Sequence, residues 1–266
     1  MAHSLSLSER AQSWDEVSFN VGGIDHCSFF IDVKVREDDA LKLMREKGLI
    51  DAAWRGESVF VSNNPYSRLE YQRIRFVLWD ILGYLPAIGD EHIAEFFYQA
   101  IGTSELREQF GTHYDRIAER TNMVRRAKSE IKAGLDIGQV KLMECGEILD
   151  QVIAALNGGP KITDVLNYKN IGQIQNMPSG FVVESICNVD ALGVHPVVGS
   201  TLPPIIESIV RPMTLRQQLY MEAAMQWDEK KLIAALATDP IVNDFLRVKD
   251  VARDIMQYNK QFLTEE

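Results

Sequence analysis

The chain has 266 residues, of which 46% are hydrophobic and 25% are charged, an ordinary composition for a globular protein. Its formal net charge of −10 opposes long-range attraction to nucleic acid and to anionic membrane surfaces. The sequence contains no run of about 18 or more apolar residues that would form a membrane-spanning helix. The N-terminal segment MAHSLSLSER is too polar for the apolar region of a signal peptide, so a cytoplasmic protein is expected.

The first third of the sequence predicts two strands followed by helices. Residues 16–36 alternate apolar and polar positions and then become β-branched and aromatic, and Gly22 and Gly23 lie between the two runs. These glycines indicate either a turn or a close approach of the backbone to another segment. Apolar spacings of three and four then predict a helix from about residue 69 to Gly83 and another from about Asp90 to Gly102.

The middle of the chain predicts a long polar helix over residues 114–133 and a shorter helix over 142–156. The polar helix has a narrow apolar stripe, formed by Ile117, Met123, Val124 and Ile131. Residues 161–200 differ, because Asn, Gly and Pro punctuate short β-rich runs.

The last third is predicted to be helical. Pro212 is expected to end one helix, and Thr214 with Gln217 matches a capping box that would start the next. Asp239 and Pro240 break that helix before a final amphipathic one. Since strands and helices do not alternate regularly and no GxGxxG segment is present, the sequence predicts an α+β fold with helices dominant, rather than a doubly wound parallel sheet.

The three cysteines, Cys27, Cys145 and Cys187, are odd in number and far apart. They fit neither a disulfide framework nor CxxC metal spacing. Buried thiols in a reducing compartment are therefore expected.

Several short motifs occur together in a fixed order. They are Val21-Gly-Gly-Ile-Asp-His26, Leu82-Gly-Tyr-Leu-Pro-Ala-Ile-Gly-Asp90 followed by Glu-His92, Asn170-Ile-Gly-Gln-Ile-Gln-Asn-Met-Pro178, Val183-Glu184, Asp190-Ala-Leu-Gly-Val-His-Pro196 and Thr238-Asp-Pro240. Each is weak alone, but their common order and spacing over roughly residues 16–250 resemble the C-terminal half of glycoside hydrolase family 4. This group includes α-glucosidases, α-galactosidases, α-galacturonidases and 6-phosphoglycosidases.

The resemblance implies a domain like the C-terminal domain of lactate and malate dehydrogenases. Residues 16–266 would form this substrate and metal domain, and residues 1–15 would be a remnant of the linker from an NAD-binding Rossmann domain that the chain lacks. The family differs from most glycosidases, which use two carboxylates. NAD takes a hydride from sugar C3, a base removes the C2 proton, the glycosidic bond leaves by elimination, and water adds before the hydride returns.

The resemblance also implies a divalent metal, usually Mn²⁺, with His26 as its ligand. Without the surrounding motif, His26 would be interpreted as a hydrogen-bonded histidine at a strand end. The family's second ligand is a cysteine that would fall near the start of the chain, where Met1-Ala2-His3-Ser4 places alanine. Cys27 is expected to be a buried thiol rather than a ligand, because neighbours in a strand point to opposite faces.

Two residues are candidates for the C2 base. Asp90 matches a catalytic carboxylate of the α-glucosidase branch, and Tyr66 matches a tyrosine that other branches use. The structural alternatives are a helix N-cap for Asp90 and a surface turn for Tyr66.

Asp25, His92 and Asn170 are the candidate substrate-binding residues. Asp25 replaces the asparagine usual in the family, and a carboxylate accepts hydrogen bonds from sugar hydroxyls but does not donate as an amide does. His92 would line the pocket, or it would be a solvated histidine in the first turn of a helix. Asn170 has the alternative of a residue that only supplies turn geometry.

The sequence therefore predicts the substrate-side part of a family 4 glycosidase that needs a separate NAD-binding chain and forms homo-oligomers. The alternative is a non-catalytic truncated remnant that serves as an assembly or weak sugar-binding module. A third interpretation, the substrate domain of a hydroxy-acid dehydrogenase, is less favoured because His26 does not lie in the context of a carboxylate-binding arginine and histidine pair.

Overall fold

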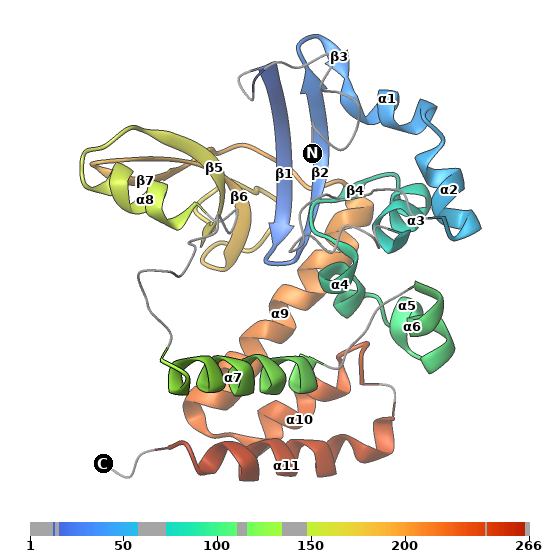
Figure 1. Ribbon diagram of the computed structural model, residues 1–266, viewed down its shortest axis with the longest axis vertical. Helices are drawn as coiled ribbons and strands as arrows, with labels where there is room; N and C mark the ends of the chain where they lie inside the picture. Colours follow the sequence, from blue (N-terminus) through green and yellow to red (C-terminus); the bar gives the residue numbers. More distant parts are fainter. Residues whose placement is uncertain are drawn as a thin grey trace.

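A computed structural model describes residue 13 and residues 16–57, 73–110, 116–134, 148–242 and 244–263 of the chain (Figure 1). An antiparallel sheet lies at one end of the molecule, and the C-terminal helices lie at the other. Within these residues no helix is long and apolar enough to cross a bilayer.

The sheet is built around a long hairpin of β1 (Val17–Ile24) and β2 (Cys27–Val35). Its main path runs β3-β2-β1-β6-β5, in which β4 also pairs with β2 and β7 pairs with β6. The other strands are β3 (Asp38–Asp39), β4 (Leu85–Pro86), β5 (Ile162–Lys169), β6 (Val182–Asp190) and β7 (Gly193–Pro196). All strand pairings in this sheet are antiparallel, which confirms the expected α+β class.

Gly22 and Gly23 lie inside β1, and the turn comes two residues later, at Asp25 and His26. The glycines mark the place where β1 meets β6, with Gly22 opposite Ser185 and Gly23 opposite Glu184. A Cβ atom on Gly22 would come within 2.9 Å of Leu202. Close packing, the second of the two expected reasons, therefore explains the pair.

The helices of the first half lie on the β2 side of the hairpin (Figure 1). The sequence analysis did not predict α1 and α2, and the helix expected after Asp90 is broken into three short pieces. The helices are α1 (Ala40–Glu46), α2 (Leu49–Arg55), α3 (Arg73–Leu82), α4 (Asp90–Ile93), the 3-10 turn η4 (Ala94–Phe96), α5 (Tyr98–Ile101) and α6 (Ser104–Phe110). Gly83 ends α3 as expected, with φ of 80°.

The second half contains α7 (Arg116–Lys132), α8 (Leu149–Leu156), α9 (Pro204–Gln226), α10 (Glu229–Ala237), η6 (Phe245–Arg247) and α11 (Val248–Lys260). The predicted break at Pro212 is wrong, because α9 continues through it. Thr214 is likewise not a helix cap. It lies inside α9, where its Oγ1 donates to the carbonyl of Val210 at 3.0 Å.

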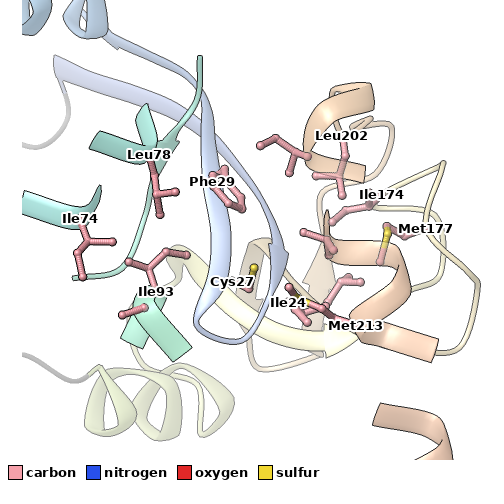
Figure 2. Close-up of a cluster of buried hydrophobic side chains, with 14 of the residues drawn as sticks. Ile24, Cys27, Phe29, Ile74, Leu78, Ile93, Ile174, Met177, Leu202 and Met213 are labelled. Atoms are coloured by element: carbon pink, nitrogen blue, oxygen red, sulfur yellow. The ribbon is translucent and has the colours of Figure 1, made fainter. Parts of the chain in front are cut away.

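The main hydrophobic core joins the tip of the hairpin to α3, α4 and α9 (Figure 2). Phe29 and Ile93 are fully buried in it, and Cys27 is buried with them. Burial raises the pKa of the Cys27 thiol to about 12, with a smaller contribution from Glu184. Cys187 is also buried, so the expectation of buried thiols is confirmed for both, and Cys145 lies outside the described residues.

Candidate functional site

The turn of the β1–β2 hairpin presents Asp25 and His26 at the surface. Their side chains are 64% and 41% exposed, and Asp25 Oδ1 lies 3.5 Å from His26 Nε2. His26 has a left-handed backbone, with φ of 62°. This conformation costs a residue other than glycine roughly 1 kcal/mol or more, so the imidazole is held at the tip despite local strain.

His92 lies against His26. It belongs to α4, which begins directly after the extended Gly89, and its ring centroid is 4.1 Å from that of His26 with the planes inclined by 45°. Two residues that are 66 positions apart in the sequence are therefore brought together. The structure brings His26, His92 and Asp25, all predicted site residues, together at the surface.

Glu184 lies on the strand beside the hairpin tip, and the sequence analysis gave it no role. It lies in β6 directly opposite Gly23, two residues before the turn. Burial raises the pKa of its carboxyl, and nearby Ser28 opposes this shift. Asp25 raises and His26 lowers the same pKa, each by less than burial does. The Val183-Glu184 motif could have drawn attention to this residue. Its position next to the hairpin tip, however, depends on how β1 pairs with β6.

Asp90 lies in the interior, beside the first residues of α3. It is only 2% exposed, and its two oxygens accept hydrogen bonds from the backbone of α3, from Ile74 N at 2.7 Å and from Arg75 N at 2.9 Å. Burial raises its pKa to about 6, and the two amides and the Arg75 guanidinium oppose the shift. Asp90 therefore caps α3 from outside, whereas the N-cap of its own helix is Gly89.

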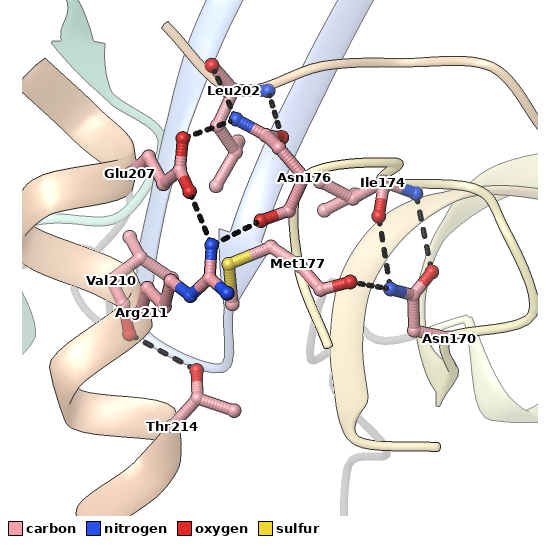
Figure 3. A network of polar contacts seen from close by, with 9 residues as sticks. All are labelled: Asn170, Ile174, Asn176, Met177, Leu202, Glu207, Val210, Arg211 and Thr214. Atoms are coloured by element: carbon pink, nitrogen blue, oxygen red, sulfur yellow. Dashed lines mark hydrogen bonds and ion pairs between the residues drawn. The ribbon is translucent and has the colours of Figure 1, made fainter. Parts of the chain in front are cut away.

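Asn170 is 1% exposed, and its side chain is used within its own loop (Figure 3). Its Nδ2 donates to the carbonyls of Ile174, Met177 and Pro178, and its Oδ1 accepts from the amides of Gly172 and Ile174. These bonds hold the turn-rich segment in shape, which favours the structural alternative over substrate binding. Tyr66 and Ala2, the remaining residues of the sequence-based hypothesis, lie outside the described residues.

A divalent metal needs more donors than this cluster provides. Among the residues that the structure describes, no three His, Cys, Asp or Glu side chains are arranged to hold an ion. His26 and Asp25 are adjacent, but a tetrahedral or octahedral ion takes four to six ligands. The described part of the chain therefore does not fit a complete metal centre by itself.

The chain is thus an α+β domain in which His26, at the tip of the hairpin, contacts His92 of α4. The family model for the family 4 glycosyl hydrolase C-terminal domain matches residues 21–242. Because that match covers most of the chain, the chain belongs to glycoside hydrolase family 4.

The chain is similar to two α-galacturonidases. It is 26% identical over 258 residues to that of Thermoanaerobacterium saccharolyticum, covering 94% of this chain and 55% of the relative. It is 27% identical over 255 residues to that of Bacillus subtilis, covering 91% and 54%. The chain thus spans about half the length of the relatives it matches.

Solved structures share the fold. The lplD protein of Bacillus subtilis superposes with a TM-score of 0.76 at 23% identity, covering 94% of this chain and 58% of the other. A 6-phospho-alpha-glucosidase from gut microorganisms, solved in complex with NAD and Mn²⁺, gives 0.71 at 17% identity, covering 98% and 59%. The expected fold, that of the C-terminal domain of lactate dehydrogenase, is therefore confirmed for the described residues.

Proposed function

We propose that this chain is the substrate-side domain of a family 4 glycosidase and hydrolyses O-glycosyl bonds only together with an NAD-binding domain. Residues 16–266 form this domain in the proposal, and residues 1–15 serve as the linker. The observation that carries the proposal is the contact between His26 and His92 at an exposed hairpin tip, in a chain that belongs to the family. An exposed tip is open to a second domain, which would close the site over the sugar.

The proposed substrate is an α-galacturonide, because the two relatives described above are α-galacturonidases. Carboxylates accept hydrogen bonds and repel other anions. Asp25 and Glu184 would therefore bind sugar hydroxyls, and the carboxylate of the galacturonide would point away from the hairpin.

When bound, NAD supplies a hydride acceptor, and a Mn²⁺-class ion polarises sugar oxygens as a Lewis acid. His26 would offer one ring nitrogen to the metal, with further ligands from outside the described residues. Asp90 and Tyr66 are the two candidates for the base that removes the C2 proton. Both oxygens of Asp90 are used by the backbone of α3, which supports Tyr66 over Asp90 in this role.

The incomplete ligand set among the described residues supports a second role, that of a non-catalytic module for assembly or weak sugar binding. The two roles differ in whether the chain can restore hydrolysis to an NAD-binding domain that lacks its own substrate side.

The test fuses this chain to the NAD-binding half of an α-galacturonidase relative and measures release of p-nitrophenol from p-nitrophenyl α-galacturonide with NAD and Mn²⁺. Hydrolysis is expected with the wild-type chain and is expected to disappear with His26→Ala. His195→Ala is the matched control, because His195 is also exposed and its Nε2 pairs with Asp190 at 3.1 Å. A folded fusion that binds NAD but hydrolyses no glycoside would favour the non-catalytic role.

A further inference from the structure

A hollow of about 350 Å³ lies between the sheet and the segments that follow β5 and β7. The described strands β1 and β6 both contribute to it, and their pairing ends at Gly22 and Ser185. At the next residue of β6, the carbonyl of Ile186 accepts from Val197 N at 2.9 Å instead of pairing with β1. Residues 197–200 therefore line the space between the two strands.

The hydroxyl of Ser185 is buried in the wall of this hollow. Ser185 is only 3% exposed, and its Oγ has no hydrogen-bond partner among the described residues. A buried hydroxyl without a partner costs free energy, and folded proteins rarely leave one unexplained. The Ser185 hydroxyl is therefore available to a molecule that enters the hollow.

The size of the hollow favours a ligand over a single bridging water. One water occupies roughly 30 Å³ in the liquid, about a tenth of the space available. Pockets for small molecules begin at roughly 300 Å³. The hollow is therefore suited to a compact ligand of about the size of one sugar ring.

Uncharged polar groups lie on the other sides of the hollow. The Nδ2 of Asn20 donates to Ser200 Oγ at 3.1 Å, which leaves Asn20 Oδ1 as an acceptor for a ligand. Gln173 is fully buried, and it is fixed by a bond to the Lys169 carbonyl at 3.0 Å and by a bond from the Ile171 amide at 2.7 Å. A wall that is already held in place lowers the entropic cost of binding.

The described residues that line the hollow include no charged side chain. A charged ligand would lose its hydration there without gaining an opposite charge. Phe19, Val21 and Val198 provide apolar surface beside the hydroxyl and amide groups. A ring that carries hydroxyl groups matches both, because its C–H groups pack on apolar walls while its hydroxyls bond to the polar groups.

We propose that this hollow binds an uncharged, polyhydroxylated ring compound of monosaccharide size, with Ser185 and Asn20 bonding to its hydroxyls. Gly22, opposite Ser185, is three residues from Asp25, a separation of about 10 Å along the strand. The proposal does not depend on the proposed glycosidase function, which concerns the hairpin tip.

Amide chemical shifts of the isotope-labelled full chain test the proposal. D-galactose, D-glucose and myo-inositol serve as uncharged probes. At least one of them is expected to shift the amides of Asn20, Ser185 and Gly199 and to saturate with a dissociation constant in the millimolar range, as ligands of about twelve non-hydrogen atoms allow. D-galacturonate, which carries a charge, is expected to bind to the same amides at least about tenfold more weakly.

Ser185→Ala removes the hydroxyl without removing a bond between described residues. The variant is expected to unfold at the same urea concentration as the wild type, or at a higher one, and to bind the probe about tenfold more weakly. Ser208→Ala is the matched control, because the Ser208 hydroxyl bonds to the carbonyl of Ile205 at 2.7 Å in an exposed part of α9. It should leave the affinity for the probe unchanged.

Four results would overturn the proposal. The first is that none of the three probes gives a saturable shift, which would mean that the hollow holds only water. The second is a shift confined to Asp25 and His26, which would place the sugar at the hairpin tip. The third is binding of galacturonate as tight as that of the uncharged probes. The fourth is a Ser185→Ala chain that binds the probe normally or unfolds at a lower urea concentration, since the hydroxyl would then have no role in binding or would already have a partner.

Discussion

The imidazole rings of His26 and His92 lie 4.1 Å apart, one on the turn of the β1–β2 hairpin and the other on the first turn of α4. Each ring restricts the orientations open to the other. The left-handed backbone at His26 adds a cost that the hairpin would avoid with glycine. A strained residue at an exposed and otherwise replaceable turn indicates selection for its side chain rather than for stability.

His26→Gly should therefore stabilise the chain while removing the functional side chain. We expect the free energy of unfolding in urea to rise by about 0.5–1 kcal/mol, because glycine adopts this backbone without the steric cost. The fused enzyme described above should lose hydrolysis with this variant. Arg36→Gly is the control at another left-handed position, with φ of 55°, and should leave hydrolysis intact. Loss of stability in His26→Gly would mean that the imidazole supports the fold.

Asp90→Asn tests the role of Asp90 as the cap of α3. The two oxygens of Asp90 accept from two different amides, and asparagine has only one acceptor oxygen to offer them. One buried amide would face the Asn NH₂ group, and we expect unfolding in urea to show a loss of about 1–3 kcal/mol.

Asp228→Asn provides the control for this substitution. The amides of Lys230 and Lys231 both bond to the same Asp228 oxygen, which asparagine can reproduce. The expected change is within about 0.5 kcal/mol, since Asn and Asp are comparable N-caps. Equal losses at both positions would contradict the two-acceptor explanation.

The pH dependence of stability provides a separate test at Asp90. Burial raises the pKa of the folded-state carboxyl from 3.8 to about 6. Its stabilising contribution is therefore fully present below pH 3.8 and is lost as the pH rises through 6. The free energy of unfolding of the wild type, relative to that of Asp90→Asn, should fall by up to about 3 kcal/mol between pH 4 and pH 7. If the free energy of unfolding of the wild type, relative to Asp90→Asn, instead rose with pH, the α3 amides and Arg75 would outweigh burial in setting the pKa of Asp90.

The strands of the hairpin and the main helices follow from local patterns, and so do the ends of α3 and α10. Pro212 shows where local rules fail. Proline removes one backbone donor, yet the buried face of α9 runs on past Pro212 and Thr214. Packing of α9 against the core outweighs the local cost of a proline inside the helix. The sequence around Pro212 does not show this packing.

The motifs predicted the candidate site only in part. The motifs named His26 and His92 as candidate site residues, each in its own segment, and the structure brings their rings into contact. They did not distinguish surface from interior for Asp90 and Asn170, whose partners depend on the packing of whole segments. Glu184 was missed for a related reason, since its proximity to His26 depends on strand register.

Asn170 allows the strongest test of a structural against a substrate-binding role. Its side chain makes five hydrogen bonds to the backbone of its own loop, three of them buried and two partly buried. Asn170→Ala would leave several buried groups without partners, each costing about 1–3 kcal/mol, so we expect unfolding in urea to show a loss of at least about 3 kcal/mol. Asn157→Ala is the control, because Asn157 is exposed and makes one bond, to the carbonyl of Ile153 at 2.8 Å. If Asn170→Ala instead kept full stability and weakened galacturonide binding in the fused enzyme, the residue would belong to the substrate site, and its loop would have to open to reach the sugar.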